Sequence, residues 1–165
     1  MKIGVVGLGF VGLSLTSVLS SKGYDTVGID INKDKCKQIS KGISPFFEPE
    51  LEKILKNGLK KKLIISNDFS LINNCDFLFV TVGTPQNTNG SIDLSIIKKA
   101  ISTIGESLKK NKKKPIIFVK STVTPAVVDA FNDLYPDHSI CYSPEFLRAK
   151  TANEDFLNQK YMVLG

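Results

Sequence analysis

Three glycines and one aspartate near the N-terminus have the types and spacing of a nucleotide-binding loop. The segment reads KIGVVGLGFVGLSL over residues 2–15, and its motif glycines are Gly7, Gly9 and Gly12. In such a loop the first glycine permits a sharp turn, the second lets a pyrophosphate approach the backbone, and the third lets helix and strand pack closely. The N–H groups at the helix start would face the phosphates. Asp30, 18 positions after Gly12, lies where a carboxylate can accept hydrogen bonds from an adenosine ribose.

Two alternative roles for this segment have less support. The glycines could serve packing alone, but Asp30 would then have no role. The run could also be a secretory signal peptide, because Lys2 is followed by 17 uncharged residues, Ile3 to Leu19. That run contains four glycines and three hydroxyl residues and is too short to cross a bilayer. We therefore interpret it as the start of the fold and expect no membrane segment.

The composition is typical of one soluble globular domain spanning residues 1–165. Hydrophobic residues make up 42% and charged residues 23% of the chain, which is long enough to bury a core. The net charge is +6, but 21 of the 22 cationic residues are lysine and only Arg148 is arginine. Nucleic-acid-binding proteins rely on arginine for bidentate contacts. The charge therefore argues against a nucleic-acid partner, and the lysine runs at 60–62 and 109–114 are expected to be solvated helix ends.

The cysteines and the histidine do not form a metal-binding pattern. Cys36, Cys75 and Cys141 are scattered, and the single histidine, His138, follows a Pro-Asp pair in an expected loop. No metal site is therefore predicted. Cys141 falls in an expected strand and is predicted to lie in the core. Scattered thiols are typical of a reducing compartment, so we expect a cytoplasmic protein.

Apolar runs that alternate with helical stretches predict an α/β fold. The run DFLFVTV at 76–82 is uninterrupted, as in a central parallel strand. The expected strands are 2–6, 25–30, 63–66, 76–82, 115–120, 139–142 and 161–164. The expected helices follow the glycine loop and occupy 32–41, 50–57 (ended by Gly58), 68–74, 94–110 and 125–134. This alternation predicts a Rossmann-like doubly wound, mainly parallel sheet with helices on both faces, in the strand order 3-2-1-4-5-6 with the seventh strand at the edge.

Polar or glycine-containing stretches follow most of the expected strands. In a doubly wound sheet, ligands bind outside the carboxyl ends of the strands. The stretches that fall there are 7–12, Asp30, 83–85, 121–122 and 143–148. Because they converge on one edge of the sheet, they predict one ligand site better than any single motif does.

Six short segments spread over the whole chain carry a family signature. They are KIGVVGLGFVGLSL at 2–15, VGIDIN at 27–32, VTVGTP at 80–85, GSIDLSII at 90–97, VKSTVTP at 119–125 and YSPEFLR at 142–148. Together they resemble the UDP-glucose dehydrogenase family of nucleotide-sugar 6-dehydrogenases. The resemblance implies NAD as cofactor and oxidation of the C6 hydroxyl of a UDP-sugar to a carboxylate, as in nucleotide-sugar metabolism and polysaccharide biosynthesis.

The resemblance also implies a second part that these residues do not contain. Family members carry a helical middle segment and a C-terminal domain that holds the catalytic cysteine, and none of the three cysteines here has that context. We therefore expect the chain to be the NAD-binding half of such an enzyme, inactive alone, with UDP-glucose as the first substrate to consider. The expected partners are a UDP-sugar and the missing C-terminal domain, and an oligomer is compatible with the sequence.

By resemblance, the cofactor site comprises Gly7, Gly9, Phe10, Val11, Gly12, Asp30, Lys35, Thr84, Pro85, Ser121 and Thr122. Asp30 is expected to favour NAD over NADP, since a carboxylate repels a 2′-phosphate. Lys35 either softens this preference or is a solvated helix lysine. Thr84 and Thr122 resemble threonines that contact the cofactor and order a water near the reacting carbon. Their alternative role is hydroxyl capping at strand ends.

The resemblance places the substrate on Glu145, Phe146, Leu147 and Arg148, and the catalytic residues are Glu145 and Thr122. Glu145 matches a family glutamate proposed for acid–base work on the thioester or its water. Its alternative role is in a helix start, with Ser143 as N-cap and Pro144 in the first helical position. Many UDP-glucose-type members have a second glutamate after the arginine, where this chain has Ala149, and this departure bears on the choice of sugar.

Two alternatives to UDP-glucose oxidation stay open. An NAD-binding sensor or regulatory module without catalysis would account for residues 7–30, but not for the motifs at 119–125 and 142–148. A dehydrogenase for another UDP-hexose would account for all of them. A basic nucleic-acid-binding protein has the least support, since basic and aromatic residues are not interleaved.

Overall fold

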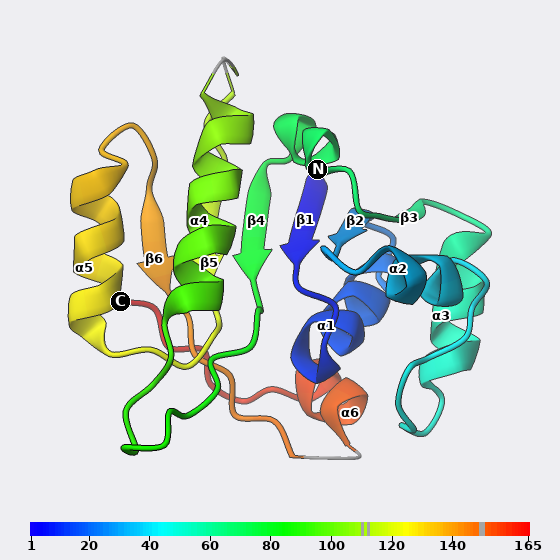
Figure 1. Ribbon diagram of the computed structural model, residues 1–165. Coiled ribbons are helices and arrows are strands. Elements are labelled where there is room, and N and C mark those ends of the chain that lie inside the picture. The colour runs from blue at the N-terminus through cyan, green and yellow to red at the C-terminus, as the bar shows by residue number, and fades with distance from the viewer. Residues whose placement is uncertain (110, 112, 149–150) are drawn as a thin grey trace.

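Six parallel strands form one sheet in the computed structural model, which describes residues 1–109, 111, 113–148 and 151–165 (Figure 1). The strands are β1 Lys2–Val6, β2 Asp25–Ile29, β3 Leu63–Ser66, β4 Phe77–Val80, β5 Ile116–Val119 and β6 Ile140–Tyr142. Their order, β3-β2-β1-β4-β5-β6, confirms the predicted doubly wound topology. The predicted positions that lie outside the described residues are Lys110, Lys112, Ala149 and Lys150.

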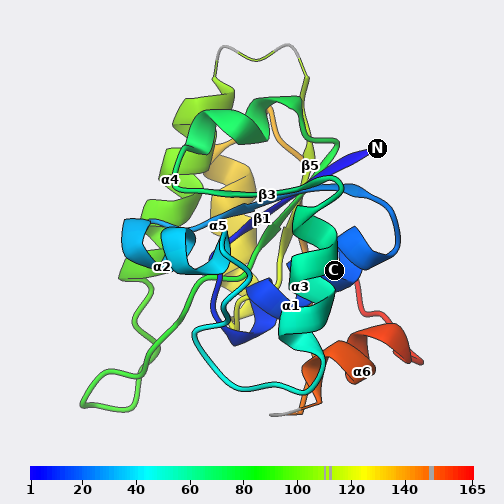
Figure 2. The same ribbon diagram turned by 90° about the vertical axis from the view of Figure 1, so that its right-hand side faces the viewer.

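Helices connect the strands and lie on both faces of the sheet (Figure 2). α4 Ser95–Leu108 and α5 Pro125–Leu134 lie on one face, and α1 Phe10–Ser21 and α3 Leu51–Leu59 lie on the other. The short helices are α2 Lys33–Ile39, the 3₁₀ helix η1 Phe69–Asn74 and α6 Ala152–Leu157. The chain leaves β1 in one direction and β4 in the other, so right-handed crossovers place their helices on opposite faces.

Two hydrophobic clusters hold the helices on the sheet. The larger cluster includes Leu78 of β4, Ile117 of β5 and Ile104 of α4, all almost completely buried. The smaller one joins Leu13 of α1 to Leu55 of α3. Because these clusters fix the helices against the middle of the strands, the carboxyl ends of the strands are left as an edge lined by loops.

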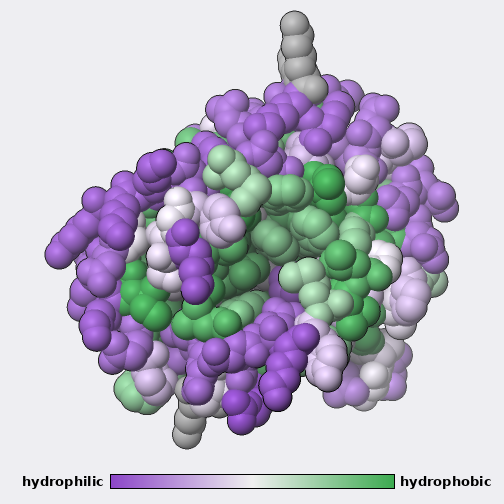
Figure 3. Space-filling view, turned by 180° about the vertical axis from the view of Figure 1, so that it is seen from behind, coloured by the Kyte–Doolittle hydropathy of each residue, from purple (hydrophilic) through white to green (hydrophobic). Residues whose placement is uncertain are grey.

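The other side chains of β4 and β5 are less well covered. The ring centroid of Phe118 lies 6.1 Å from that of Phe77 and 5.1 Å from that of Phe79. All three side chains are only partly buried. Ile116 is 40% exposed. Seen from behind, apolar side chains gather in a hollow of the surface (Figure 3). Helices on this face therefore cover β4 and β5 less completely than those on the opposite face.

Glu48 attaches α6 to α1. It lies in the loop between α2 and α3 and is only 6% exposed. One carboxylate oxygen accepts a hydrogen bond from the Ser14 hydroxyl of α1 at 2.8 Å, and the other accepts one from the Asn153 N–H of α6 at 2.5 Å. The negative charge also suits the amino end of α6. This carboxylate thereby holds α6 beneath the helix that follows the glycine loop.

The predicted seventh strand is wrong. Residues 159–165 form no strand, and Tyr161, Met162 and Leu164 are 79%, 68% and 56% exposed. Gly165 nevertheless exchanges two backbone hydrogen bonds with Tyr142, at 2.6 and 2.9 Å. β6 has only three residues and offers few backbone partners, so an adjoining strand gains little pairing.

Two local predictions also need correction. Gly58 lies inside α3 instead of ending it, because its missing side chain leaves room for Ser20 of α1. Cys141 lies in β6 as predicted, but it is only partly buried and does not belong to the core. Successive side chains of a strand point to opposite faces of the sheet, and Ile140 belongs to the larger cluster. The Cys141 side chain therefore lies on the other, less covered face.

Candidate functional site

The glycine loop has the geometry that its sequence predicts. Gly7 directly follows β1 with φ of +97°, and its N–H donates to the carbonyl of Ile29 at 2.8 Å. A Cβ on Gly12 would lie 1.8 Å from the Gly7 carbonyl oxygen, so only glycine lets α1 approach the turn this closely. A Cβ on Gly9 would meet no atom within 4 Å. The space over Gly9 is therefore free for a ligand to approach the backbone.

The amino end of α1 is suited to an anion. Gly9 is its N-cap, so no side chain satisfies the first N–H groups, and the first turn contains no acidic residue. Unsatisfied N–H groups and the helix dipole favour a bound phosphate at such an end. Phe10 and Val11, in this turn, are partly buried, and Phe10 packs on Phe46 with ring centroids 5.3 Å apart.

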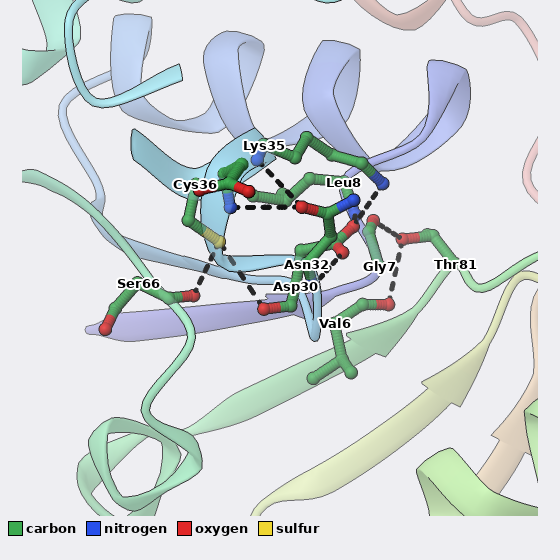
Figure 4. Close-up of polar contacts among 10 residues, drawn as sticks. Val6, Gly7, Leu8, Asp30, Asn32, Lys35, Cys36, Ser66 and Thr81 are labelled. Carbon is green, nitrogen blue, oxygen red and sulfur yellow. Dashed lines mark hydrogen bonds and ion pairs between the residues drawn. The ribbon is translucent and has the colours of Figure 1, made fainter. Parts of the chain in front are cut away.

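Thr81 supports the glycine loop and was not predicted. It follows β4 and is 8% exposed, and its hydroxyl lies 2.7 Å from the Gly7 carbonyl and 3.1 Å from that of Val6, sharing one proton between them (Figure 4). The side chain therefore holds the turn from the neighbouring strand. The signal that could have found it is a hydroxyl within the otherwise apolar run at 77–82.

Asp30 lies immediately after β2, beside the glycine loop, and is 6% exposed. Its Oδ2 accepts hydrogen bonds from the Leu8 N–H at 2.8 Å and the Lys35 ammonium at 2.7 Å. Its Oδ1 accepts one from the Asn32 N–H at 2.9 Å (Figure 4). An ionised carboxylate has about four acceptor positions, so these three hydrogen bonds leave one position on Oδ1 without a partner among the described residues.

The charge on Asp30 is stabilised by these donors. Burial raises the pKa of Asp30, but hydrogen bonds from Lys35, Asn32 and Leu8 outweigh it and hold the pKa below its ordinary value. Asn32 also caps α2 by accepting from the Lys35 N–H at 3.0 Å, which directs that residue toward Asp30. The Cys36 thiol lies 3.4 Å from the Asp30 carbonyl and 3.3 Å from that of Ser66, which ties α2 to two strands.

The predicted residues after β4 and β5 divide into two kinds. Ser121 is buried, and its hydroxyl donates to the Val82 carbonyl at 2.7 Å, so it joins the two strand ends. Thr84 is partly buried and Thr122 is exposed, and neither hydroxyl makes a hydrogen bond within the described ranges. Pro85 directly follows Thr84 and is exposed. The two threonine hydroxyls therefore have no protein partner in that part of the chain, whereas that of Ser121 is used by the fold.

A cavity of about 520 Å³ adjoins the segment 143–148. Its lining includes Lys120, Glu145, Phe146, Leu147 and Arg148, together with residues of α6 and of the chain end at 158–163. The segment itself forms no helix, so the helix-start role of Ser143 and Pro144 is wrong. Glu145 instead folds back, and its Oε2 accepts from the Leu147 N–H at 2.7 Å.

Arg148 is held by Asp155 of α6. Its Nη2 lies 2.7 Å from Oδ1 of Asp155, while its Nε and its backbone N–H lie 3.3 and 2.9 Å from Oδ2. These hydrogen bonds lower the pKa of Asp155 to about 2. The Arg148 side chain is still 74% exposed, so part of the guanidinium remains accessible at the cavity.

The structure thus joins the glycine loop, Asp30 and Lys35 in one contact cluster and gathers Glu145 to Arg148 around a cavity. Thr84 and Thr122 follow the strands that lie between these two groups. No set of three or more potential metal ligands occurs among the residues that the structure describes. Within the same residues, no helix has the length and apolar character needed to cross a membrane.

Comparisons with known proteins agree with this geometry. The model of the UDP-glucose/GDP-mannose dehydrogenase family, NAD binding domain, matches residues 1–165. The chain is 36% identical to GDP-mannose 6-dehydrogenase of Pseudomonas syringae pv. tomato, over 100% of this chain and 40% of that protein. It is 31% identical to UDP-glucose 6-dehydrogenase AglM of Haloferax volcanii, over 100% of this chain and 41% of that protein.

A solved structure shares the same fold. The crystal structure of a ternary complex of GDP-mannose dehydrogenase from Pseudomonas aeruginosa matches 100% of this chain and 41% of its own, with a TM-score of 0.93 and 32% identity. The chain therefore spans about two fifths of the length of these relatives.

Proposed function

Because the chain belongs to the UDP-glucose/GDP-mannose dehydrogenase family, as its NAD-binding domain, we propose that it provides the cofactor half of a nucleotide-sugar 6-dehydrogenase. The observation that carries the proposal is the Asp30 carboxylate beside the open space over Gly9. The N–H groups of α1 would bind the pyrophosphate, and Asp30 would accept a ribose hydroxyl. A 2′-phosphate would meet the same buried carboxylate, which favours NAD over NADP.

The residues at the strand ends have separate roles in this proposal. NAD, when bound, supplies the hydride acceptor for the oxidation of the sugar C6 hydroxyl. Thr84 and Thr122 contact the cofactor and order water beside it. Glu145 would accept a proton from the water that hydrolyses the thioester and return it to the leaving thiolate, and Phe146, Leu147 and Arg148 would line the sugar side of the cavity. A catalytic thiol would come from another part of the enzyme, since none of Cys36, Cys75 and Cys141 lines the cavity beside Glu145. Burial also raises the pKa of Cys36 and of Cys75, the latter to about 11.

UDP-glucose is the first substrate that we propose, through the motif at 142–148, and the reaction product would be UDP-glucuronate. GDP-mannose is the second, because one relative at 36% identity is a GDP-mannose 6-dehydrogenase. Another UDP-hexose or a catalytically silent NAD sensor are the remaining candidates. Three unpaired thiols also fit a cytoplasmic location.

The test is calorimetric titration of the chain with NAD, followed by an assay of NADH formation with UDP-glucose, GDP-mannose and other UDP-hexoses. We expect saturable binding by these 165 residues and no turnover by them alone, and turnover with one sugar nucleotide when the polypeptide of the whole reading frame is used. Absence of saturable NAD binding would refute the cofactor role. Binding without turnover by the polypeptide of the whole reading frame would favour the sensor.

A further inference from the structure

Lys120 is a buried amine whose partners are backbone carbonyls. It directly follows β5 and is 7% exposed. Its ammonium donates to the Ser143 carbonyl at 3.0 Å and to the Pro144 carbonyl at 3.3 Å. It forms no ion pair within the part of the chain that the structure describes. Burial lowers the pKa of Lys120, against the opposing effect of the Glu145 charge. A buried ammonium is unfavourable unless it is well hydrogen-bonded, so this placement must have a physical reason.

The reason lies in the backbone that follows β6. The Ser143 N–H still donates to the Val119 carbonyl at 2.9 Å, which continues the pairing between β5 and β6. Pro144 has no N–H, and residues 143–148 have no regular structure. Ser143 is 2% exposed, so its carbonyl needs a donor that is neither water nor a strand. The Lys120 ammonium takes the place of the absent strand at this point.

Glu145 is the next residue along this segment. It lines the same cavity as Lys120, and its carboxylate accepts a hydrogen bond from the Leu147 N–H. The position of Glu145 therefore depends on two carbonyls that the ammonium holds. The geometry points to Lys120 as a positioning residue, which anchors the turn at Ser143 and Pro144 and so places Glu145 at the cavity. The functional part of this inference rests on the proposed role of Glu145 in nucleotide-sugar oxidation.

The structural arm of the test uses the 165-residue chain. Amide hydrogen exchange over 143–148 is measured in wild type, Lys120→Met, Lys120→Arg and the control Lys99→Met, which removes an exposed lysine of α4. We expect exchange to be roughly tenfold faster or more in Lys120→Met, because a hydrogen bond to a charged donor contributes at least the free energy of a factor of about ten. Lys120→Arg keeps the donors and should restore the slow rate, and Lys99→Met should match wild type.

Binding of NAD is measured on the same four proteins. We expect the Kd to change by less than about twofold in Lys120→Met. The glycine loop and Asp30 lie at other strand ends, and the backbone that leads to Thr122 is held by N–H groups of Lys120 and Ser121, which donate to the Val80 carbonyl without the lysine side chain. If Lys120→Met lacks a cooperative thermal transition, Lys120→Gln replaces it. Glutamine is polar but uncharged and one atom shorter, so it should not hold both carbonyls, and exchange should again be faster than in wild type. Equal exchange in wild type and the variant would overturn the inference, as would a Lys120→Arg variant as fast as Lys120→Met.

The functional arm uses turnover by the polypeptide of the whole reading frame. If Lys120 acts through Glu145, Lys120→Met should lower kcat with little change in the KM for NAD, and it should have no further effect in a Glu145→Gln background. If the losses of kcat multiply in the Lys120→Met, Glu145→Gln double variant, Lys120 acts independently of Glu145, and the positioning role is overturned. Wild-type protein without NAD binding or turnover would instead refute the proposed function, and the exchange comparison would still decide whether Lys120 anchors the segment.

Discussion

Gly9→Ala separates the stability of the glycine loop from its binding role. Gly9 has φ of −77° and ψ of −163°, an extended conformation that alanine adopts freely, and its Cβ would meet no atom within 4 Å. The folded chain therefore accommodates the methyl group without strain. A bound pyrophosphate would occupy that open space, so the methyl group should block its approach to the N–H groups of α1.

The expected change in the free energy of unfolding follows from the effects of the methyl group on the folded and the unfolded chain. Glycine is preferred over alanine at an N-cap by roughly 0.5–1 kcal/mol. The reduced freedom of the unfolded chain favours alanine by about 0.4–1 kcal/mol, so the free energy of unfolding should stay within about 1 kcal/mol of wild type. Loss of one hydrogen bond to a charged phosphate is worth about 1.5–3 kcal/mol, which weakens the Kd for NAD roughly 10- to 150-fold.

Calorimetry with NAD and urea denaturation test both quantities. Gly12→Ala is the contrasting variant, because its methyl group would lie 1.8 Å from the Gly7 carbonyl oxygen and would push α1 away from the turn. Overpacking of this kind lowers the free energy of unfolding by about 1–3 kcal/mol, so Gly12→Ala should lose stability as well as binding. Wild-type affinity in Gly9→Ala would refute the placement of the pyrophosphate. A loss of stability in Gly9→Ala equal to that of Gly12→Ala would refute the distinction between the two glycines.

Three further predictions concern carboxylates. Asp30→Ala should weaken NAD binding roughly tenfold or more, because the ribose loses a charged acceptor, whereas the exposed Asp34→Ala should leave the calorimetric Kd unchanged. Glu50→Gly should raise the free energy of unfolding in urea by up to about 1 kcal/mol, since Glu50 has φ of +61°; a loss of stability would contradict this. Asp155→Asn should be destabilising at neutral pH. Hydrogen bonds from Arg148 lower the pKa of Asp155 from 3.8 in the unfolded chain to about 2 in the folded chain. The stabilisation by the Asp155 carboxylate is therefore fully present above the unfolded pKa and is lost as pH falls through the folded pKa. Melting temperatures of wild type and Asp155→Asn should therefore converge in acid, and a constant difference would contradict the ion pair.

Most of the fold could be predicted because its signals are local. Apolar runs such as 76–82 and the glycines of the loop at 7–12 act through their own backbone and nearest neighbours. Alternation of strands and helices then leaves few topologies, since crossovers are right-handed. The seventh strand failed because the run at 161–164 is apolar enough for a strand, while its formation depends on partners that the three-residue β6 does not provide.

The candidate site was predictable only in part. Asp30 and Lys35 were both assigned to the cofactor site, but their ion pair was not predicted, because Lys35 was expected either to soften the preference for NAD or to be a solvated helix lysine. Thr81 and Lys120 were missed because their partners lie 74 and 23 residues away, on segments that only the sheet brings together. Glu48 was missed for the same reason, since its contact in α6 is 105 residues distant.

The sequence by itself determined the order of the elements, the conformation of the glycine loop and the strand ends on which the polar residues lie. The tertiary structure decided which of those polar groups remain available to a ligand. The Ser121 hydroxyl is satisfied inside the fold, and Asp155 occupies one edge of the Arg148 guanidinium. One acceptor position of Asp30 and the hydroxyls of Thr84 and Thr122 have no partner among the residues that the structure describes. The reason is physical: a buried polar group must find a hydrogen-bond partner, and that partner is chosen by which distant segments the packed sheet places beside it.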